Sequence, residues 1–139
     1  MPHVTVDYSP RLGGVLAGTS FVAELHQLVL DVSRSEGVCK VFLRAAAETY
    51  IGGGEGDRHT ALVHVGIGLL PGRPDSLKDR LSERVLALLR RYLPPDPGGT
   101  GTVCTVEVRD LSPSYRLSRE APAVAPHREE PGRHPSAAC

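Results

Sequence analysis

The order in which strand and helix patterns follow one another constrains the fold of this chain most. A strand pattern, a helix pattern and a second strand pattern succeed one another over residues 3–50, and the same order recurs over residues 61–109. Two strands joined through a helix pair in parallel, and the crossover between them is right-handed. The sequence therefore predicts an α/β (α+β) fold in which two β-α-β units form one four-stranded sheet with two helices on one face.

Four segments show strand patterns. The first alternates apolar and polar residues, which is typical of a half-buried strand. The third is a nearly continuous apolar run, which is typical of a central strand covered on both faces. The expected strands are residues 3–8, 38–50, 61–70 and 102–109.

Two segments, residues 19–34 and 75–93, repeat apolar residues with the 3.6-residue period of an amphipathic helix. Proline and glycines predict a loop over residues 10–18. The glycine-rich residues 51–59 are followed by a strand pattern, whereas a phosphate-binding loop leads into a helix. A hairpin-like turn is therefore expected there.

The composition argues against several classes of protein. Lys+Arg and Asp+Glu number 16 each, so the formal net charge is zero, whereas a nucleic-acid-binding protein usually has a basic face. The three cysteines are far apart and lack the spacing of a zinc or redox site. No apolar run approaches membrane-spanning length. We expect a cytoplasmic protein without metal, cofactor, nucleic-acid or membrane partners.

The domain is expected to span residues 1–119. The Pro-rich residues 120–139 carry too little apolar surface to offset the entropy of ordering, so a disordered tail is expected. The strand patterns at 61–70 and 102–109 have apolar residues on both sides, but a single helical layer covers one face of a sheet. The second face is therefore expected to be covered by further copies of the chain.

A proline follows the initiator methionine and opens the first strand. If Met1 is removed, Pro2 carries a secondary amine at the chain terminus. Burial disfavours the protonated form of an amine and lowers its pKa toward working pH. Pro2 is therefore a candidate general base, although small residues, proline included, are also common after a start methionine.

Several segments together resemble the 5-carboxymethyl-2-hydroxymuconate isomerase family of the tautomerase superfamily. They are the N-terminal MPHVTVDYS, the apolar strand that begins ALVHV, the turn at Gly72 and Arg73, and the later segments VEVRDL and SYR. The resemblance covers residues 2–119. It implies a homotrimer whose sheets face an inner barrel. It also implies a cofactor-free reaction in which the N-terminal proline amine moves a proton between carbon and oxygen sites of an unsaturated keto or hydroxy acid.

The resemblance assigns Pro2 as the catalytic base and Arg73 as an arginine that binds a substrate carboxylate. A cation near an amine disfavours its protonation, and a guanidinium binds an anion through two N–H groups. Arg73 can equally be a surface charge at the start of a helix. Where the family has a second arginine this chain has Phe42. Arg44 follows on the same strand face and is either a displaced substitute or a structural residue. Asp7 replaces a glutamate of the family.

The sequence thus predicts a tautomerase or isomerase that catalyses 1,3- or 1,5-keto–enol proton transfer on a small anionic substrate, with Pro2 as base and Arg73, with or without Arg44, as anion clamp. Two alternatives stay open. One is a non-catalytic module that binds a small metabolite. The other is a tautomerase relative recruited to a biosynthetic pathway, in which the Pro2 amine acts as a nucleophile through an iminium.

Overall fold

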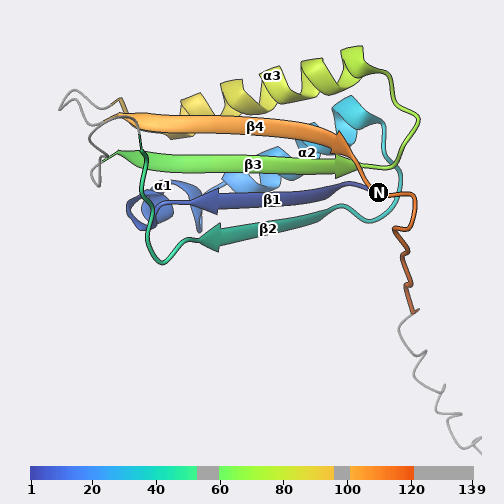
Figure 1. Cartoon of the computed structure of the whole chain (residues 1–139), viewed down its shortest axis with the longest axis horizontal. Coiled ribbons are helices and arrows are strands. Elements are labelled where there is room, and N and C mark those ends of the chain that lie inside the picture. The colour runs from blue at the N-terminus through green and yellow to red at the C-terminus, as the bar shows by residue number, and fades with distance from the viewer. Residues whose placement is uncertain (53–59, 96–100, 121–139) are drawn as a thin grey trace, which may run out of the picture.

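The computed structural model describes residues 1–52, 60–95 and 101–120, which contain one sheet with the strand order β2-β1-β3-β4 (Figure 1). β1 pairs in parallel with β2, and β3 pairs in parallel with β4, whereas β1 and β3 are antiparallel. The two predicted β-α-β units are therefore present and meet in the middle of a mixed sheet. The strands are β1 (His3–Tyr8), β2 (Lys40–Ala45), β3 (Ala61–Leu69) and β4 (Thr102–Asp110).

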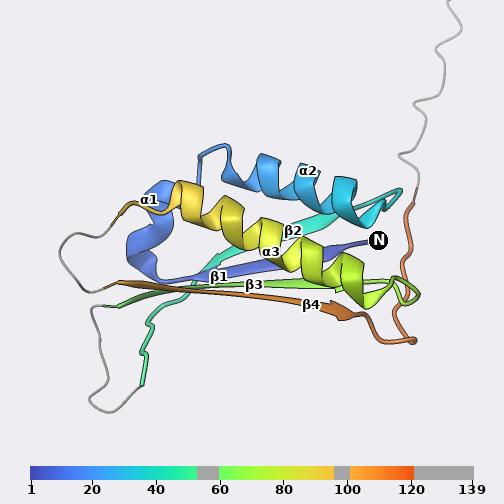
Figure 2. The ribbon, with the colours of Figure 1, turned by 90° about the horizontal axis from the view of Figure 1, so that it is seen from above.

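The helices α2 (Phe21–Ser33) and α3 (Asp75–Tyr92) lie next to each other on one face of the sheet, as predicted (Figure 2). Before α2 come a 3-10 turn, η1 (Pro10–Leu12), and a one-turn helix, α1 (Gly13–Leu16). The prediction of a loop there was wrong, because Leu12 and Leu16 are buried. Packing of these two side chains outweighs the low helix propensity of the glycines between them.

β2 is shorter than predicted. It ends at Ala45, which pairs with Tyr8, the last residue of β1. β1 ends at Tyr8, so residues 46–50, which were predicted to continue the strand, have no residue of β1 to pair with.

The core lies between the sheet and the two long helices. Alternate residues of β1 and β3 face it, and one side of each helix covers them, which is the amphipathic arrangement that the periods predict. The largest fully buried side chains are Phe21, Leu16, Leu25, Ile67, Leu69, Leu81, Leu89, Val4, Val6, Val29, Val63 and Val65.

The opposite face of the sheet, which we call the open face, carries none of the helices in the described residues (Figure 2). On β3 it presents the residues that alternate with the buried ones. The prediction of an apolar second face was wrong, because most of these positions are occupied by glycine or histidine. The case for a covering copy therefore rests on the resemblance, and the homotrimer stays a prediction. The open face consists of His3, Thr5, Asp7, Lys40, Phe42, Arg44, Leu62, His64, Gly66, Gly68, Val103, Thr105, Glu107 and Arg109.

After β4 the chain turns back across one end of the open face. The Leu111 backbone N–H donates to the Leu69 carbonyl at 2.7 Å, and the Leu111 side chain lies over Gly68. The Lys40 ammonium on β2 lies 5.3 Å from the centroid of the Tyr115 ring. Residues 111–115 therefore run from β4 to β2 past the start of β1.

We expect Gly68→Ala to lower the free energy of unfolding by about 1–3 kcal/mol, the usual cost of overpacking. A Cβ at Gly68 would lie 2.4 Å from Leu111 Cδ2. Chemical denaturation measures the effect, and adding Leu111→Ala should recover part of it. Gly66→Ala is the matched control, since its nearest contact is Thr5 Oγ1 at 3.2 Å. Equal losses for the two alanine variants would contradict this account.

Two sequence predictions fall largely outside the described residues. These are the glycine-rich turn at 51–59 and the tail at 120–139. In the part of the chain that the structure describes, no single helix is long and apolar enough to cross a membrane.

Candidate active site

Pro2 lies at the start of β1, at the end of the sheet where β3 finishes. The residue is buried, and its carbonyl oxygen accepts the backbone N–H of Lys40 on β2 at 3.1 Å. On the other side of β1, His3 pairs with Gly68 near the end of β3. A proline fits the first position of a strand because it has no backbone N–H to donate to the ladder. The sheet therefore holds the start of β1 from both sides.

Met1 precedes Pro2, and its amine lies in a partly desolvated and positively charged environment. The Met1 side chain packs against Gly37. A Cβ added to Gly37 would lie 3.4 Å from Met1 Cε. Burial lowers the pKa of the Met1 amine, the positive charge of Arg73 lowers it further, and Cys39 opposes them. The first two effects disfavour a protonated amine. An amine at this end of β1 is thus shifted toward its neutral, basic form.

Arg73 lies in the turn between β3 and α3 and connects that turn to the end of α2. Gly72 makes the turn with a φ of 113°, which glycine adopts without strain. Arg73 Nε donates to the Ser33 carbonyl at 2.9 Å, Nη2 to Ser35 Oγ at 2.9 Å and Nη1 to the Leu70 carbonyl at 3.2 Å. The last carbonyls of a helix lack partners within it, and its dipole favours a cation there. These bonds use three of the five N–H donors of a guanidinium, so two have no partner among the residues that the structure describes and suit an anion.

Arg44 lies toward the opposite end of β1 from Pro2. Its Nε and Nη2 donate to the two carboxylate oxygens of Asp7 at 2.8 and 3.0 Å, and both side chains are exposed. Asp7 is five residues along the strand from Pro2, which corresponds to about 16 Å. The chain therefore brings Arg73, but not Arg44, to the Pro2 end of the sheet. A role for Arg44 in substrate binding stays a prediction that requires a neighbouring copy of the chain.

We expect Arg44→Gln to leave the urea midpoint of unfolding essentially unchanged, because ion pairs between exposed side chains contribute little to stability. The measurement is a double-mutant cycle with Asp7→Asn. A large coupling between the two positions would contradict this prediction and would indicate that other groups bury the pair.

Solved structures of other proteins share this architecture. A 5-carboxymethyl-2-hydroxymuconate isomerase from Deinococcus radiodurans R1 matches with a TM-score of 0.72 at 16% sequence identity, over 86% of this chain and 90% of that chain. A 5-carboxymethyl-2-hydroxymuconate delta-isomerase matches with a TM-score of 0.66 at 19% identity, over 86% of this chain and 89% of that chain. The chain has the tautomerase fold.

A third structure with the tautomerase fold was solved after inactivation by 2-oxo-3-pentynoate. It matches with a TM-score of 0.53 at 16% identity, over 78% of this chain and 85% of that chain. No protein-family model matches the sequence, and no curated protein matches it. The comparisons thus confirm the resemblance seen in the sequence at the level of the fold.

Two further side chains lie at the Pro2 end of this tautomerase fold. The Lys40 ammonium lies against the face of the Tyr115 ring, and the Tyr115 hydroxyl is buried without a hydrogen-bond partner among the residues described. A buried hydroxyl without a partner is unusual and costly, so its position favours a ligand oxygen or a water molecule. In the sequence Tyr115 entered only through the resemblance. Lys40 was missed, although it shares a strand face with Phe42.

The described histidines and cysteines do not form a metal site. Within residues 1–52, 60–95 and 101–120, no three His, Cys, Asp or Glu side chains are grouped so that they could hold a metal ion. The ring of His3 lies 5.5 Å from that of Phe42. Cys39 and Cys104 are partly buried and pack against the core.

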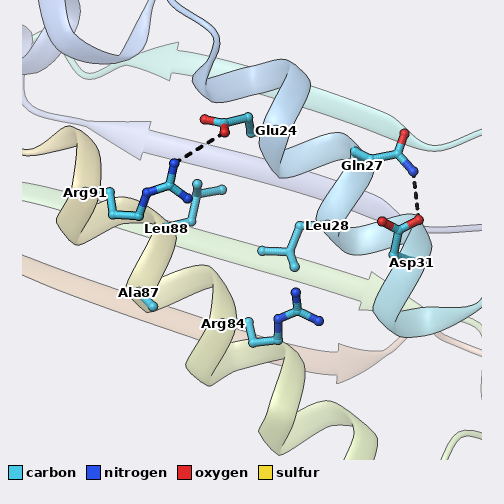
Figure 3. A pocket seen from close by; sticks show the side chains of 8 residues that line it. All are labelled: Glu24, Gln27, Leu28, Asp31, Arg84, Ala87, Leu88 and Arg91. Atoms are coloured by element: carbon cyan, nitrogen blue, oxygen red, sulfur yellow. Dashed lines mark hydrogen bonds and ion pairs between the residues drawn. The ribbon is translucent and has the colours of Figure 1, made fainter.

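A groove of about 410 Å³ lies between α2 and α3, in the helix layer (Figure 3). Arg91 on α3 forms an ion pair with Glu24 on α2 at 3.4 Å, and Gln27 donates to Asp31 at 2.7 Å. The polar groups at its rim thus largely satisfy one another. We interpret the groove as the solvated seam between two amphipathic helices, not as the place of the chemistry.

Proposed function

We propose that this protein is a cofactor-free tautomerase in which the secondary amine of Pro2, released by removal of Met1, acts as general base. The observation that carries the proposal is the position of the chain terminus, which is partly desolvated and close to the Arg73 guanidinium. Both features lower the pKa of an amine there and increase the neutral fraction that can accept a proton.

The reaction consists of two proton transfers. The neutral Pro2 amine takes a proton from the carbon next to a carbonyl group or at the end of a conjugated system, and the electron pair moves toward the carbonyl oxygen. The free N–H donors of Arg73 stabilise the charge that develops on that oxygen. The protonated amine then returns the proton to a different carbon or oxygen, and the enzyme is restored.

The substrate class follows from the cation at the site. Two free N–H donors on one guanidinium match the two oxygens of a carboxylate, which favours a small unsaturated keto or hydroxy acid. The unpartnered Tyr115 hydroxyl at the same end of the sheet is suited to a further oxygen of such a substrate. In the proposed homotrimer, a neighbouring copy would supply Arg44 as a second carboxylate ligand.

A second candidate function uses the same amine as a nucleophile. A lowered pKa increases the neutral fraction that attacks a carbonyl carbon, and loss of water then gives an iminium. Incubation with a carbonyl substrate and borohydride distinguishes the two, since only the nucleophile leaves a covalent adduct on Pro2.

Intact mass and ultraviolet absorbance test the proposal together. The mass should correspond to the chain without Met1, and the protein should turn over an enolisable acid from a panel that includes phenylpyruvate and 2-hydroxymuconate. A protein that retains Met1 has an amide nitrogen at Pro2, which is not basic. That result would exclude both chemical roles and favour a non-catalytic module that binds a small metabolite.

A further inference from the structure

Two serine hydroxyls at the end of α2 connect the Arg73 guanidinium to the helix. Arg73 Nη2 donates to Ser35 Oγ at 2.9 Å, and Ser35 Oγ lies 2.7 Å from Ser33 Oγ. The Ser33 hydroxyl donates to the Val29 carbonyl at 2.6 Å, inside the last turn of α2. Three hydrogen bonds in series therefore run from the guanidinium into the helix.

The direction of each bond in this series is fixed. The single proton of the Ser33 hydroxyl is used on the Val29 carbonyl, so Ser33 Oγ accepts from Ser35. The Ser35 hydroxyl then offers its lone pairs to Arg73, whose guanidinium can only donate. Ser35 is thus held as an acceptor for the guanidinium, and bonds in such a series strengthen one another.

The backbone between the two serines brings their hydroxyls together. Arg34 ends α2 with a φ of 52°, in the left-handed region, where residues other than glycine are uncommon. It is the only non-glycine residue with a positive φ in the described part of the chain. Ser33 is buried and Ser35 is partly buried, so water has limited access to the pair. The turn at Arg34 therefore places Ser35 between Ser33 and the guanidinium.

The bonds of Arg73 leave two of its protons in a fixed direction. Nε and Nη2 donate to the Ser33 carbonyl and to Ser35 Oγ, at the end of α2, and Nη1 donates to the Leu70 carbonyl, just after β3. One proton on Nη1 and one on Nη2 have no partner among the described residues. Acceptors from two separate segments fix the plane of the guanidinium, and with it the direction of these two protons.

We infer that Ser35 is a positioning residue for Arg73: its hydroxyl holds the guanidinium so that the two remaining N–H donors meet the substrate anion beside the chain terminus. The inference rests on the proposed function, because Arg73 is the anion ligand only in that reaction. Loss of the Ser35 hydroxyl leaves the positive charge at the site but releases Nη2. The position of the guanidinium and its charge are therefore separable by experiment.

The first test measures the mobility of the guanidinium without any substrate. In NMR spectra of the nitrogen-labelled full chain, the two Nη groups of an arginine give separate signals only while rotation about the Nε–Cζ bond is slow. The Arg73 signals are assigned by their loss in Arg73→Gln. Ser35→Ala should speed this rotation about tenfold, as expected for the loss of a hydrogen bond to a charged group. Ser35→Thr, which keeps the hydroxyl, should restore the slow rotation.

The second test is kinetic and uses the panel of enolisable acids. Ser35→Ala should lower kcat/KM about tenfold through the same lost bond. The acidic limb of kcat/KM against pH should stay in place, because the charge of Arg73 remains. Ser35→Thr should recover kcat/KM. The matched control is Ser82→Ala on α3, whose hydroxyl donates to the Asp79 carbonyl at 2.8 Å and whose loss should leave kcat/KM unchanged.

A serine that only completes the end of α2 would lower the urea midpoint of unfolding when replaced by alanine and leave both the rotation and kcat/KM unchanged. That result would overturn the inference, as would an equal loss of kcat/KM in Ser82→Ala. If the wild type turns over none of the acids, the proposed function fails, and the rotation of Arg73 alone decides whether Ser35 holds the guanidinium. If Ser35→Ala does not fold, Ser35→Cys takes its place, since sulfur is a weak acceptor.

Discussion

Replacing Pro2 by alanine should lower kcat/KM for an enolisable acid by a factor of about 10² or more, the usual contribution of a general base. Alanine leaves a primary amine after removal of Met1, so some activity should persist. The primary amine lacks the ring that fixes the position of the nitrogen at the start of β1. The measurement is the initial rate by ultraviolet absorbance, with intact mass recorded on the same preparations.

The control for Pro2→Ala is a preparation in which Met1 is retained. Its terminal amine is displaced by one residue and the Pro2 nitrogen is an amide, so activity should be lost while the sheet, which begins at His3, stays intact. Circular dichroism and the oligomeric state should match those of the wild type. Full activity with Met1 present would contradict the assignment of Pro2 as base.

The sequence predicted the elements because their patterns are local. The alternation in residues 3–8 and the 3.6-residue periods of the two long helices depend only on neighbours along the chain. The strand order and the antiparallel pairing of β1 with β3 depend on contacts between distant segments, and no local pattern contains them. On β3, the positions that face away from the core include two glycines and His64, so the sequence pattern was wrongly interpreted as apolar on both faces.

The candidate site was predictable to the extent that it depends on single residues. Pro2 and Arg73 were identified through the resemblance, and the structure brings them to one end of the sheet. The contacts of Arg73 with Ser33 and Ser35 depend on how the turn after β3 packs against the end of α2, so no spacing in the sequence indicates them. The same holds for Tyr115, which reaches this end only because the chain folds back after β4.

Arg73→Gln should affect both stability and catalysis, because the guanidinium has two roles. Loss of its hydrogen bonds to Ser33, Ser35 and Leu70 should lower the free energy of unfolding by about 1–3 kcal/mol, since a helix end is left without partners. Loss of the group that stabilises the developing oxygen charge should lower kcat/KM by about 10². Chemical denaturation and steady-state kinetics measure the two effects separately.

The pH profile distinguishes an electrostatic role of Arg73 from a purely structural one. Burial lowers the pKa of the Met1 amine and the positive charge of Arg73 lowers it further, and we expect the same direction for the Pro2 amine one residue along the chain. Without that charge the amine pKa rises, and the amine becomes neutral only at higher pH. The acidic limb of kcat/KM against pH should therefore move to higher pH in Arg73→Gln.

Arg91→Gln provides the matched control, since it removes the same charge from the helix layer, where Arg91 pairs with Glu24. Its acidic limb should coincide with that of the wild type. If the acidic limb of kcat/KM against pH does not move in Arg73→Gln but the free energy of unfolding falls, the role of Arg73 is only to stabilise the end of α2. The cation that binds the substrate would then have to be sought elsewhere, with Lys40, whose backbone N–H bonds to the Pro2 carbonyl, as one described alternative at that end of the sheet.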